Sequence, residues 1–356
     1  MDLNVSADQE LLAETTRRFL ERECPITEVR RLHDEAVDGF DREYWRKGCE
    51  LGWTAMLVPE ADGGGSVSGD GLLDLVLVAE EMGRLVSPGP LVPVNVVADA
   101  LARRGTDAQR AAVLPDLVSG DAIATWAFAE SNDSWDAAGV TLTAVADWFL
   151  VTARTGEGLT QFLVPADTTG VTVTRLGTLD LTRQFGSIAF EQTTVSGDAV
   201  VGEVGGAAGD VERQLEVALV LHDAETVGAT DVVFNFTLEY AKDRIAFGRP
   251  IGSYQALKHR FADMRTWLEG CHATATASAR AVQAGDDDAA ELVSVAKSYI
   301  ADRCPSIIQD CVQLHGGIGV TWEHDLHLYL RRVAQNAALY GSVEQHRERL
   351  AVLIGM

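Results

Sequence analysis

The sequence predicts a multi-domain α+β protein: an N-terminal all-α domain, a middle antiparallel β domain and a C-terminal helix bundle. Three observations predict this order. Apolar residues recur at helical spacing over roughly the first hundred residues, and short segments rich in Val, Thr, Phe and Trp follow from about residue 122. Long helical stretches return after residue 205. The predicted domains therefore span residues 1–120, 121–205 and 206–356.

The N-terminal domain is predicted to be helical because its apolar residues share one face of each segment. In ADQELLAETTRRFLERE, for example, Leu12, Phe19 and Leu20 have helical spacing. Gly- and Pro-rich stretches, LVPEADGGGSVSGDG and SPGPLVP, interrupt the pattern as loops. Thr106 has the chemistry of an N-cap for the last helix of this domain.

The middle and C-terminal domains differ in the length of their elements. The middle segments, such as DWFLVTAR and GSIAFEQTTV, are short and separated by Gly, Asp and Asn, as antiparallel strands are. Residues 211–243, 254–284 and 289–314 are long helical stretches with short connections, which is typical of a helix bundle. Because these helices carry apolar residues on more than one face, the bundle is expected to form the main interface of a dimer or a dimer of dimers.

Composition and charge restrict the function. The 356 residues are 47% hydrophobic and 23% charged, as in a globular protein. With 53 acidic and 29 basic residues the formal charge is −24, which disfavours nucleic acid and anionic membranes as partners. No apolar run reaches membrane-spanning length, and the N-terminus lacks the pattern of a secretory signal. Five cysteines without a disulfide or metal spacing indicate reduced thiols and a cytoplasmic location.

Several common motifs are absent from the sequence. No GxGxxG follows a predicted strand, and GxxxxGK[ST], HExxH and GxSxG do not occur. His324 and His327 lie three residues apart beside acidic residues, but no second ligand cluster is evident. We interpret them as residues of a solvated helix face and predict no metal site.

Two segments of the predicted bundle carry a chemical signal. DRIAFGRPIGSYQAL, residues 243–257, ends one helix, makes a turn and begins another, with Arg244 and Arg249 beside exposed backbone N–H groups. This arrangement suits a pyrophosphate or another anion. QLHGGIGVTWEHDLHLYLRR, residues 313–332, contains a glycine-rich break that lets a cofactor or another chain approach the backbone closely.

Together the two segments closely resemble the acyl-CoA dehydrogenase family. The RxxFG turn followed by Gln255, and QLHGGIG followed by YLRR, are stretches typical of that family. LGWTAMLVPEADGGG resembles its Pro-Glu-x-x-Gly-Gly loop, and the resemblance covers the whole chain in the same domain order. It implies an FAD-dependent oxidoreductase of lipid metabolism that desaturates an acyl thioester such as acyl-CoA. An electron-transfer flavoprotein-like acceptor is then an expected partner.

In this family a carboxylate removes the α-proton of the thioester while flavin N5 takes the β-hydride. The two positions at which family members carry that glutamate correspond here to Gly341 and Ala218, neither of which can take a proton. Glu344, Glu216 and Asp223 lie nearby in sequence, and we interpret them as solvated helix residues. No catalytic residue is therefore predicted.

The resemblance divides the flavin site into two halves of different quality. In the family's sheet domain a Thr meets the flavin ring, and this chain has Ala129 at that position. The family's Gly-x-Lys-x-Trp-Ile-Thr stretch, whose Trp packs on the flavin, is missing. Val343 replaces a Thr beside the base. The half that family members lend to the flavin of a neighbouring subunit is intact. Its matching residues are Arg244, Phe247, Gln255, Gln313, Gly316 and Gly317.

Three hypotheses follow. The first is a non-catalytic subunit that completes the FAD site of a related partner chain, as in heteromeric actinobacterial members with one degenerate subunit type. The second is a homo-oligomeric flavoenzyme with an unorthodox base among Glu344, Glu216 and Asp223. The third is a flavin-free binding or scaffold protein that reuses the fold, against which the intact RxxFG and QLHGGIG segments argue.

Overall fold

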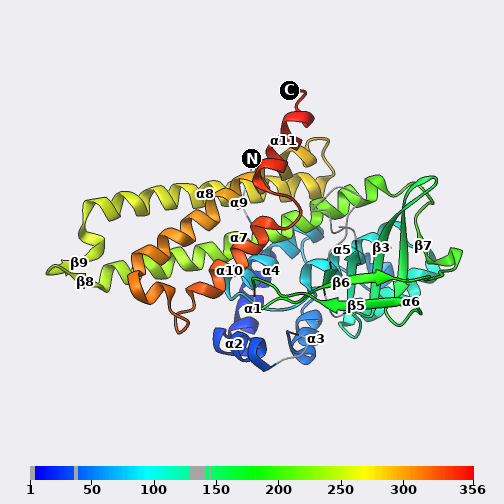
Figure 1. The fold of residues 1–356 in the computed structure, drawn as a ribbon, viewed down its shortest axis with the longest axis horizontal. Coiled ribbons are helices and arrows are strands. Elements are labelled where there is room, and N and C mark those ends of the chain that lie inside the picture. Colours follow the sequence, from blue (N-terminus) through cyan, green and yellow to red (C-terminus); the bar gives the residue numbers. More distant parts are fainter. Residues whose placement is uncertain (1–4, 36–38, 128–141, 144–145, 181) are drawn as a thin grey trace. The chain divides into compact units, whose positions relative to one another are not determined.

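The computed structural model describes residues 5–35, 39–127, 142–143, 146–180 and 182–356 (Figure 1). Contacts divide these residues into two compact units. The first, here the sheet unit, comprises residues 5–78 and 88–218, and the second, here the bundle unit, comprises residues 79–87 and 219–356. Helices α4 (Gly71–Arg84) and α7 (Ala208–Asp243) contribute residues to both units. The boundaries expected at residues 120 and 205 stay predictions.

The N-terminal helices of the sheet unit begin at side chains that satisfy their first N–H groups. Ser6 accepts a hydrogen bond from Gln9 N at 3.2 Å, and Asp41 caps the helix that follows it. Thr106 accepts from Gln109 N at 3.2 Å, which confirms it as an N-cap. Ser6, Asp41 and Thr106 cap α1, α3 and α6 respectively. Besides α4, the helices of this part are α1 (Ala7–Glu23), α2 (Ile26–Glu35), α3 (Arg42–Glu50), η1 (Glu60–Asp62), α5 (Leu91–Arg104) and α6 (Asp107–Ser119).

The strands form two small sheets. One has the order β1-β3-β4-β7 and the other the order β2-β6-β5. The strands and the short helix among them are β1 (Ala124–Ala127), β2 (Leu142–Thr143), β3 (Trp148–Thr155), β4 (Gly158–Pro165), β5 (Val171–Arg175), β6 (Phe185–Phe190), η2 (Gly197–Ala199) and β7 (Val200–Val201).

One strand pair departs from the antiparallel arrangement that the sequence predicts. β1 pairs with β3 in parallel, whereas β3–β4, β4–β7, β2–β6 and β5–β6 are antiparallel. The tight turn at residues 156–157 allows only an antiparallel β3–β4 pair, while the longer connection over residues 128–147 permits a parallel one. Buried side chains of the first sheet form a core, and partly buried side chains of the second sheet pack against it. It contains Ala127, Phe149 and Val164, with Phe162, Val171, Ile188 and Val195 packed against them.

The bundle unit consists of long helices, as predicted. Because α8 and α9 pack along their length, their facing side chains are buried, among them Met264, Leu268, Cys271, Cys304 and Ile307. The two sulfur atoms of Cys271 and Cys304 lie 3.7 Å apart. The elements after α7 are β8 (Ile245–Ala246), β9 (Arg249–Pro250), η3 (Ile251–Ser253), α8 (Gln255–Ala284), α9 (Ala289–His315), η4 (Gly316–Val320), α10 (Leu326–Ala338) and α11 (Val343–Leu353).

Candidate functional site

The RxxFG segment forms a tight hairpin at the end of α7. β8 pairs with β9 through Ile245 opposite Pro250 and Ala246 opposite Arg249, which leaves Phe247 and Gly248 as the turn. Both turn residues have positive φ, +52° and +81°, as a two-residue hairpin of the tightest kind requires. Glycine adopts this backbone freely, but for phenylalanine it is strained. The strained Phe247 side chain is nevertheless 98% exposed, so the fold holds an aromatic ring out into solvent.

Other contacts hold the hairpin in place. Tyr254 donates its hydroxyl hydrogen to Ala246 O at 3.0 Å, and the Arg249 guanidinium lies 3.9 Å from the centre of the Tyr254 ring. Ile251 N donates to Arg244 O at 2.8 Å. Arg244 and Arg249 are both exposed. Arg249 also contacts the Tyr254 ring within the hairpin, whereas Arg244 belongs to the residues expected to bind the cofactor.

The glycine-rich segment meets the same end of the bundle unit. Tyr240 on α7 stacks on His315, the last residue of α9, with ring centres 4.4 Å apart and planes 19° from parallel. His315 Nδ1 donates to Cys311 O at 2.9 Å, because a carbonyl oxygen only accepts. This stack brings the chain after His315 beside the end of α7, and Figure 1 shows β8 and β9 near the same end of the bundle unit.

We call this end of the bundle unit, residues 244–255 and 313–322, the bundle tip. All six cofactor residues expected from the sequence lie on it and are exposed. A Cβ atom added at Gly316 or Gly317 would meet nothing within 4 Å, so the backbone there is open to approach. A guanidinium, two side-chain amides and an accessible glycine backbone are a donor set that fits the phosphate and adenosine part of FAD. The six residues are Arg244, Phe247, Gln255, Gln313, Gly316 and Gly317.

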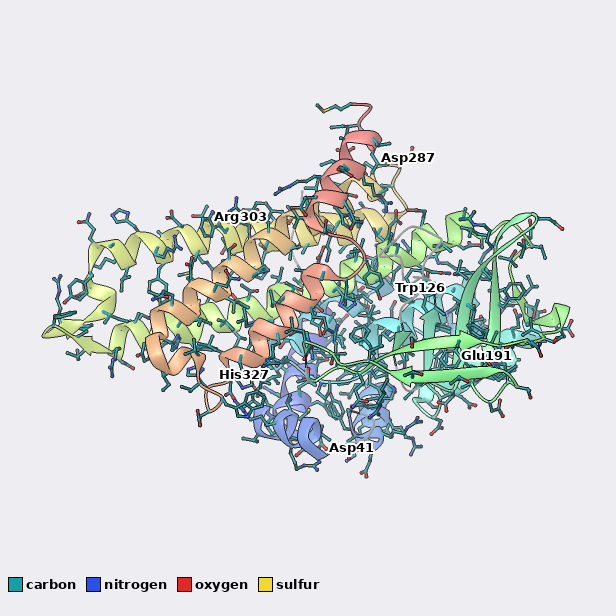
Figure 2. All side chains as sticks on the ribbon, in the orientation of Figure 1. Asp41, Trp126, Glu191, Asp287, Arg303 and His327 are labelled. Atoms are coloured by element: carbon teal, nitrogen blue, oxygen red, sulfur yellow. The ribbon has the colours of Figure 1, made fainter. Side chains whose placement is uncertain are left out.

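The bundle tip also carries apolar side chains that the sequence analysis did not identify. Val320 is 75% exposed, and Ile245, Ile318 and Trp322 are exposed as well. Trp322 stacks on His327 with ring centres 4.4 Å apart. His327 is labelled in Figure 2. The signal in the sequence was weak, because apolar residues beside a glycine-rich turn look like ordinary core residues.

A neighbouring imidazole lies beside Gly341, where the resemblance places the catalytic glutamate. A Cβ atom there would lie 2.9 Å from His346 Nε2, and the φ of Gly341 is +115°, which side chains rarely adopt. His346 is only 3% exposed, and its Nε2 donates to Tyr340 O at 3.0 Å. Burial lowers the pKa of His346 to about 4. The sequence analysis missed His346, because a single histidine on a polar helix carries no pattern.

The second expected base position has no titratable group, and two of the candidate acids lie outside the core. Ala218 on α7 is fully buried and has no titratable group. Glu344 is exposed in the first turn of α11, where hydrogen bonds from its own backbone N–H and from Ser342 lower its pKa. Glu216 is half-buried, so it is not the fully solvated residue that the sequence suggested.

The interpretation of Asp223 as a solvated helix residue is wrong. It is buried in the bundle unit rather than solvated, and its Oδ2 has no hydrogen-bond partner. Burial raises the pKa of this carboxyl group, and burial lowers the pKa of the neighbouring Lys297 ammonium, which donates to Asn336 O at 2.6 Å. Helical periodicity misjudged Asp223 because a polar residue on a helix that is buried all round gives no sign of its partner.

A buried polar network lies beside these groups. Arg332 on α10 forms an ion pair with Glu225 on α7, and Asn336 Nδ2 donates to the other Glu225 oxygen at 2.9 Å. His222 Nδ1 lies 3.5 Å from Glu225 Oε2. The network links α7 to α10 and is fully enclosed, so it stabilises the bundle unit rather than facing a ligand.

The structure adds little about the other positions that the sequence singles out. Ala129 lies outside the described residues, and Val343 is the half-buried first residue of α11. His324 Nδ1 accepts from Leu326 N, and His327 Nε2 is bonded to Trp322 O. Among the described residues, no group of three potential metal ligands is present, and no helix is both long and apolar enough to cross a membrane.

Comparisons with known proteins identify the family. Residues 6–121 match the acyl-CoA dehydrogenase N-terminal domain, and residues 209–354 match the acyl-CoA dehydrogenase C-terminal domain. Acyl-CoA dehydrogenase IpdE2 of Mycolicibacterium smegmatis is 34% identical over 349 residues, which is 97% of this chain and 98% of that protein.

Solved structures agree with this result. A chain of the ChsE4-ChsE5 complex from Mycobacterium tuberculosis is 29% identical, with a TM-score of 0.87 and 99% of both chains covered. Butyryl-CoA dehydrogenase from Megasphaera elsdenii is 23% identical and has the same fold, with a TM-score of 0.89 and coverage of 99% of this chain and 100% of that one. The chain belongs to the acyl-CoA dehydrogenase family.

Proposed function

We propose that this chain is a non-catalytic subunit that completes the FAD site of a related acyl-CoA dehydrogenase chain. One contrast supports the proposal: all six expected cofactor residues are exposed on the bundle tip, whereas His346 lies beside Gly341, where the resemblance places the catalytic glutamate. A chain of this kind contributes to a neighbour's site and has no carboxylate of its own at either family position. The relative described as a ChsE4-ChsE5 complex supports an assembly of two different chains.

The residues of the bundle tip would act by binding and orientation. Arg244 would pair with the pyrophosphate, because an exposed guanidinium forms charge-assisted bonds to phosphate oxygens. Gln313 would donate from its amide, and the open backbone at Gly316 and Gly317 would allow close approach of the adenosine end. Phe247 would cover the cofactor from solvent. Bound FAD supplies the hydride acceptor for desaturation, and the partner chain supplies the base.

The partner molecules follow from this role. The substrate would be an acyl-CoA or a similar acyl thioester bound by the catalytic chain, and an electron-transfer flavoprotein-like acceptor would reoxidise the flavin. A cytoplasmic location belongs to the same proposal, because all five cysteines are free thiols in the structure. Neither of the other hypotheses gains a specific observation: Asp223 is enclosed within the bundle unit, and a flavin-free protein would not need an outward Arg244.

The experiment compares flavin content in the chain alone and after co-expression with a related acyl-CoA dehydrogenase chain that carries the family's catalytic glutamate. We expect little or no flavin absorbance alone and one FAD per pair of unlike chains after co-expression. Arg244→Ala in the non-catalytic chain should reduce that flavin content, while Lys242→Ala, which removes an exposed charge two residues earlier, should not. A yellow homo-oligomer with one FAD per chain would support the homo-oligomeric enzyme, and flavin in neither preparation would support the scaffold protein.

A further inference from the structure

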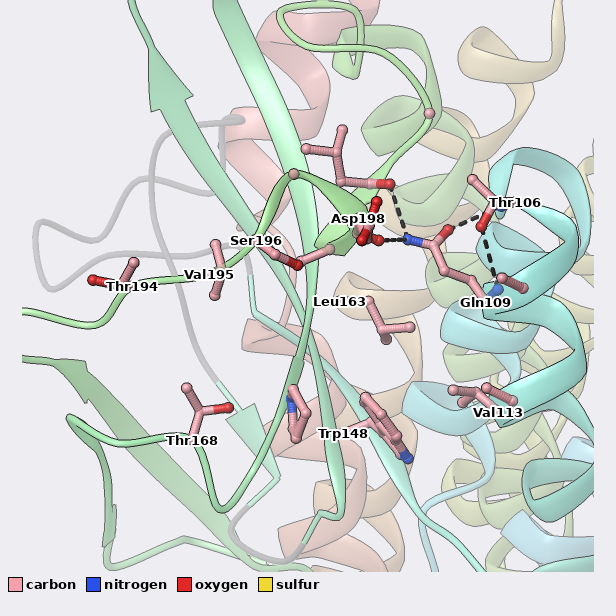
Figure 3. A pocket seen from close by; sticks show the side chains of 17 residues that line it. Thr106, Gln109, Val113, Trp148, Leu163, Thr168, Thr194, Val195, Ser196 and Asp198 are labelled. Atoms are coloured by element: carbon pink, nitrogen blue, oxygen red, sulfur yellow. Dashed lines mark hydrogen bonds between the residues drawn. The ribbon is translucent and has the colours of Figure 1, made fainter.

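A groove with a volume of about 820 Å³ lies within the sheet unit (Figure 3). It is bounded by the first half of α6, the ends of β3 and β4 that Trp148 and Pro165 mark, and residues 194–200. This volume is within the range of small-molecule sites, which is about 300–1,000 Å³. Its lining includes none of the six cofactor residues and neither base position, so the proposed function makes no use of it.

The floor of the groove is apolar. Trp148 and Leu163 from the sheet face Val113 of α6, and Figure 3 shows these three side chains together between the strands and the helix. Ala108 and Ala112 lie one turn apart on α6, so at these two positions only a methyl group stands between the helix and a molecule in the groove. An apolar molecule can therefore approach the α6 backbone closely.

The wall of the groove is fixed before any ligand arrives. The amide nitrogen of Gln109 donates to Asp198 O at 2.8 Å and to Val200 O at 2.9 Å, and its oxygen accepts from Thr106 N at 2.9 Å. Gln109 is buried, and these bonds (dashed in Figure 3) tie residues 198–200 to the start of α6. A wall held in this way lowers the ordering cost of binding.

The charges of the lining restrict the ligand. Asp198 is its one charged residue, and no Lys, Arg or His is among the seventeen lining residues. A phosphate, a carboxylate or a coenzyme A thioester would find no cation there and would be repelled by Asp198. The hydroxyl groups of Thr168, Thr194 and Ser196 can donate to or accept from a neutral polar group.

We propose that this groove binds an uncharged, mainly apolar small molecule that carries one hydrogen-bonding group. The apolar floor would hold the body of the molecule, and a hydroxyl at the rim would bond to its polar group. The site is separate from the bundle tip in its residues and in the charge of its ligand.

The test uses two fluorescent probes, the neutral ketone Nile red and the anionic 8-anilinonaphthalene-1-sulfonate, with the full chain. We expect saturable binding of Nile red that Ala112→Arg weakens by at least about tenfold. Ala111→Arg is the matched control, because Ala111 is an exposed neighbour on α6 outside this groove, and it should change the affinity by less than about twofold. Val195→Trp fills the groove from the opposite wall without adding a charge and should weaken Nile red as Ala112→Arg does.

Other results would contradict the proposed site or its ligand class. Equal affinities in the Ala112→Arg and Ala111→Arg variants, or no saturable Nile red binding to the unmodified chain, would overturn the site. Tighter binding of the anionic probe than of Nile red, with the same sensitivity to Val195→Trp, would overturn the assigned ligand class. Circular dichroism of each variant separates loss of the groove from loss of the fold.

Discussion

His346 and the local backbone together determine what position 341 can hold. The imidazole lies within 2.9 Å of where the first side-chain atom at position 341 would be, and the backbone there has a φ of +115°. An acid returned to this position would therefore need both a strained backbone and a displaced histidine. The surroundings of position 341 thus favour glycine over any residue that carries a side chain.

We predict that Gly341→Ala lowers the free energy of unfolding by about 1–3 kcal/mol, because any Cβ at this φ is strained and contacts His346. Gly177→Ala is the control, since a Cβ at Gly177 meets nothing within 4 Å, and it should cost less than about 0.5 kcal/mol. Urea unfolding of both variants measures the difference. Equal stability of the two would show that the turn at Gly341 adapts freely.

Protonation of His346 should weaken the folded state in acid. Its pKa is about 4 in the folded chain and 6.5 for an unperturbed histidine, so the unfolded chain binds more protons between these two values. The stabilisation is therefore complete above pH 6.5 and is lost as the pH falls toward 4, by about 3 kcal/mol in total. The facing charges of Lys297 and Arg349 act in the same direction, because both disfavour a second cation.

The measurement compares the pH dependence of unfolding for the unmodified chain and for His346→Asn, which cannot take up that proton. The buried Asp223 has a raised pKa and so contributes the opposite slope in the acid range, but it contributes equally to both proteins. Their stabilities should converge as the pH falls from 7 to 4. Parallel curves would contradict the burial effect assigned to His346.

The helices show which parts of the fold a sequence predicts. The Thr106 cap and the ends of α7, α8 and α9 follow from local side-chain chemistry and periodicity, so they could be predicted. The parallel β1–β3 pair could not, because its register depends on contacts between strands that are far apart in the chain. For the same reason the motifs identified Arg244 and Gln313, but not the partners of Asp223 or the imidazole beside Gly341.

Helix α10 contains two neighbouring arginines with opposite surroundings. Arg332 is fully buried against Glu225, whereas Arg331 is half-buried with its guanidinium 5.7 Å from the centre of the Trp322 ring. Removing one partner of a buried ion pair leaves an uncompensated charge in the bundle unit. Substituting each arginine in turn therefore shows how much of the effect on stability comes from burial, because the residue type is the same at both positions.

We predict that Arg332→Met costs about 3–5 kcal/mol of unfolding free energy, because Glu225 then stays buried without its cation. Arg331→Met should cost less than about 1 kcal/mol, the scale of an exposed cation–π contact. Calorimetry of both variants provides the comparison. The double variant Arg332→Met with Glu225→Leu should recover much of the loss, and failure to recover would assign the cost to packing instead.

At the scale of the whole molecule, a formal charge of −24 opposes association between copies of this chain. Apolar contacts must therefore supply the attraction in any assembly, and the bundle tip exposes Phe247, Val320 and Trp322 for such contacts. Salt screens the repulsion without weakening the apolar term. Assembly of the chain should consequently increase with ionic strength.

We predict that the chain forms a dimer or a dimer of dimers and that Phe247→Asp dissociates it. A ring that is 98% exposed on a strained turn gains burial when a partner covers it, and an aspartate there adds a further negative charge to an already acidic molecule. Phe190→Asp is the matched control, because Phe190 is also exposed but lies on β6 of the sheet unit. Light scattering at micromolar concentration should give the assembled mass for the unmodified chain and for Phe190→Asp, and a smaller mass for Phe247→Asp.

Raising the salt concentration should restore part of the assembly in Phe247→Asp if charge repulsion contributes to the loss. A stable monomer of the unmodified chain, or dissociation by Phe190→Asp alone, would place the subunit contact away from the bundle tip and would remove the support that Phe247 gives to a shared cofactor site.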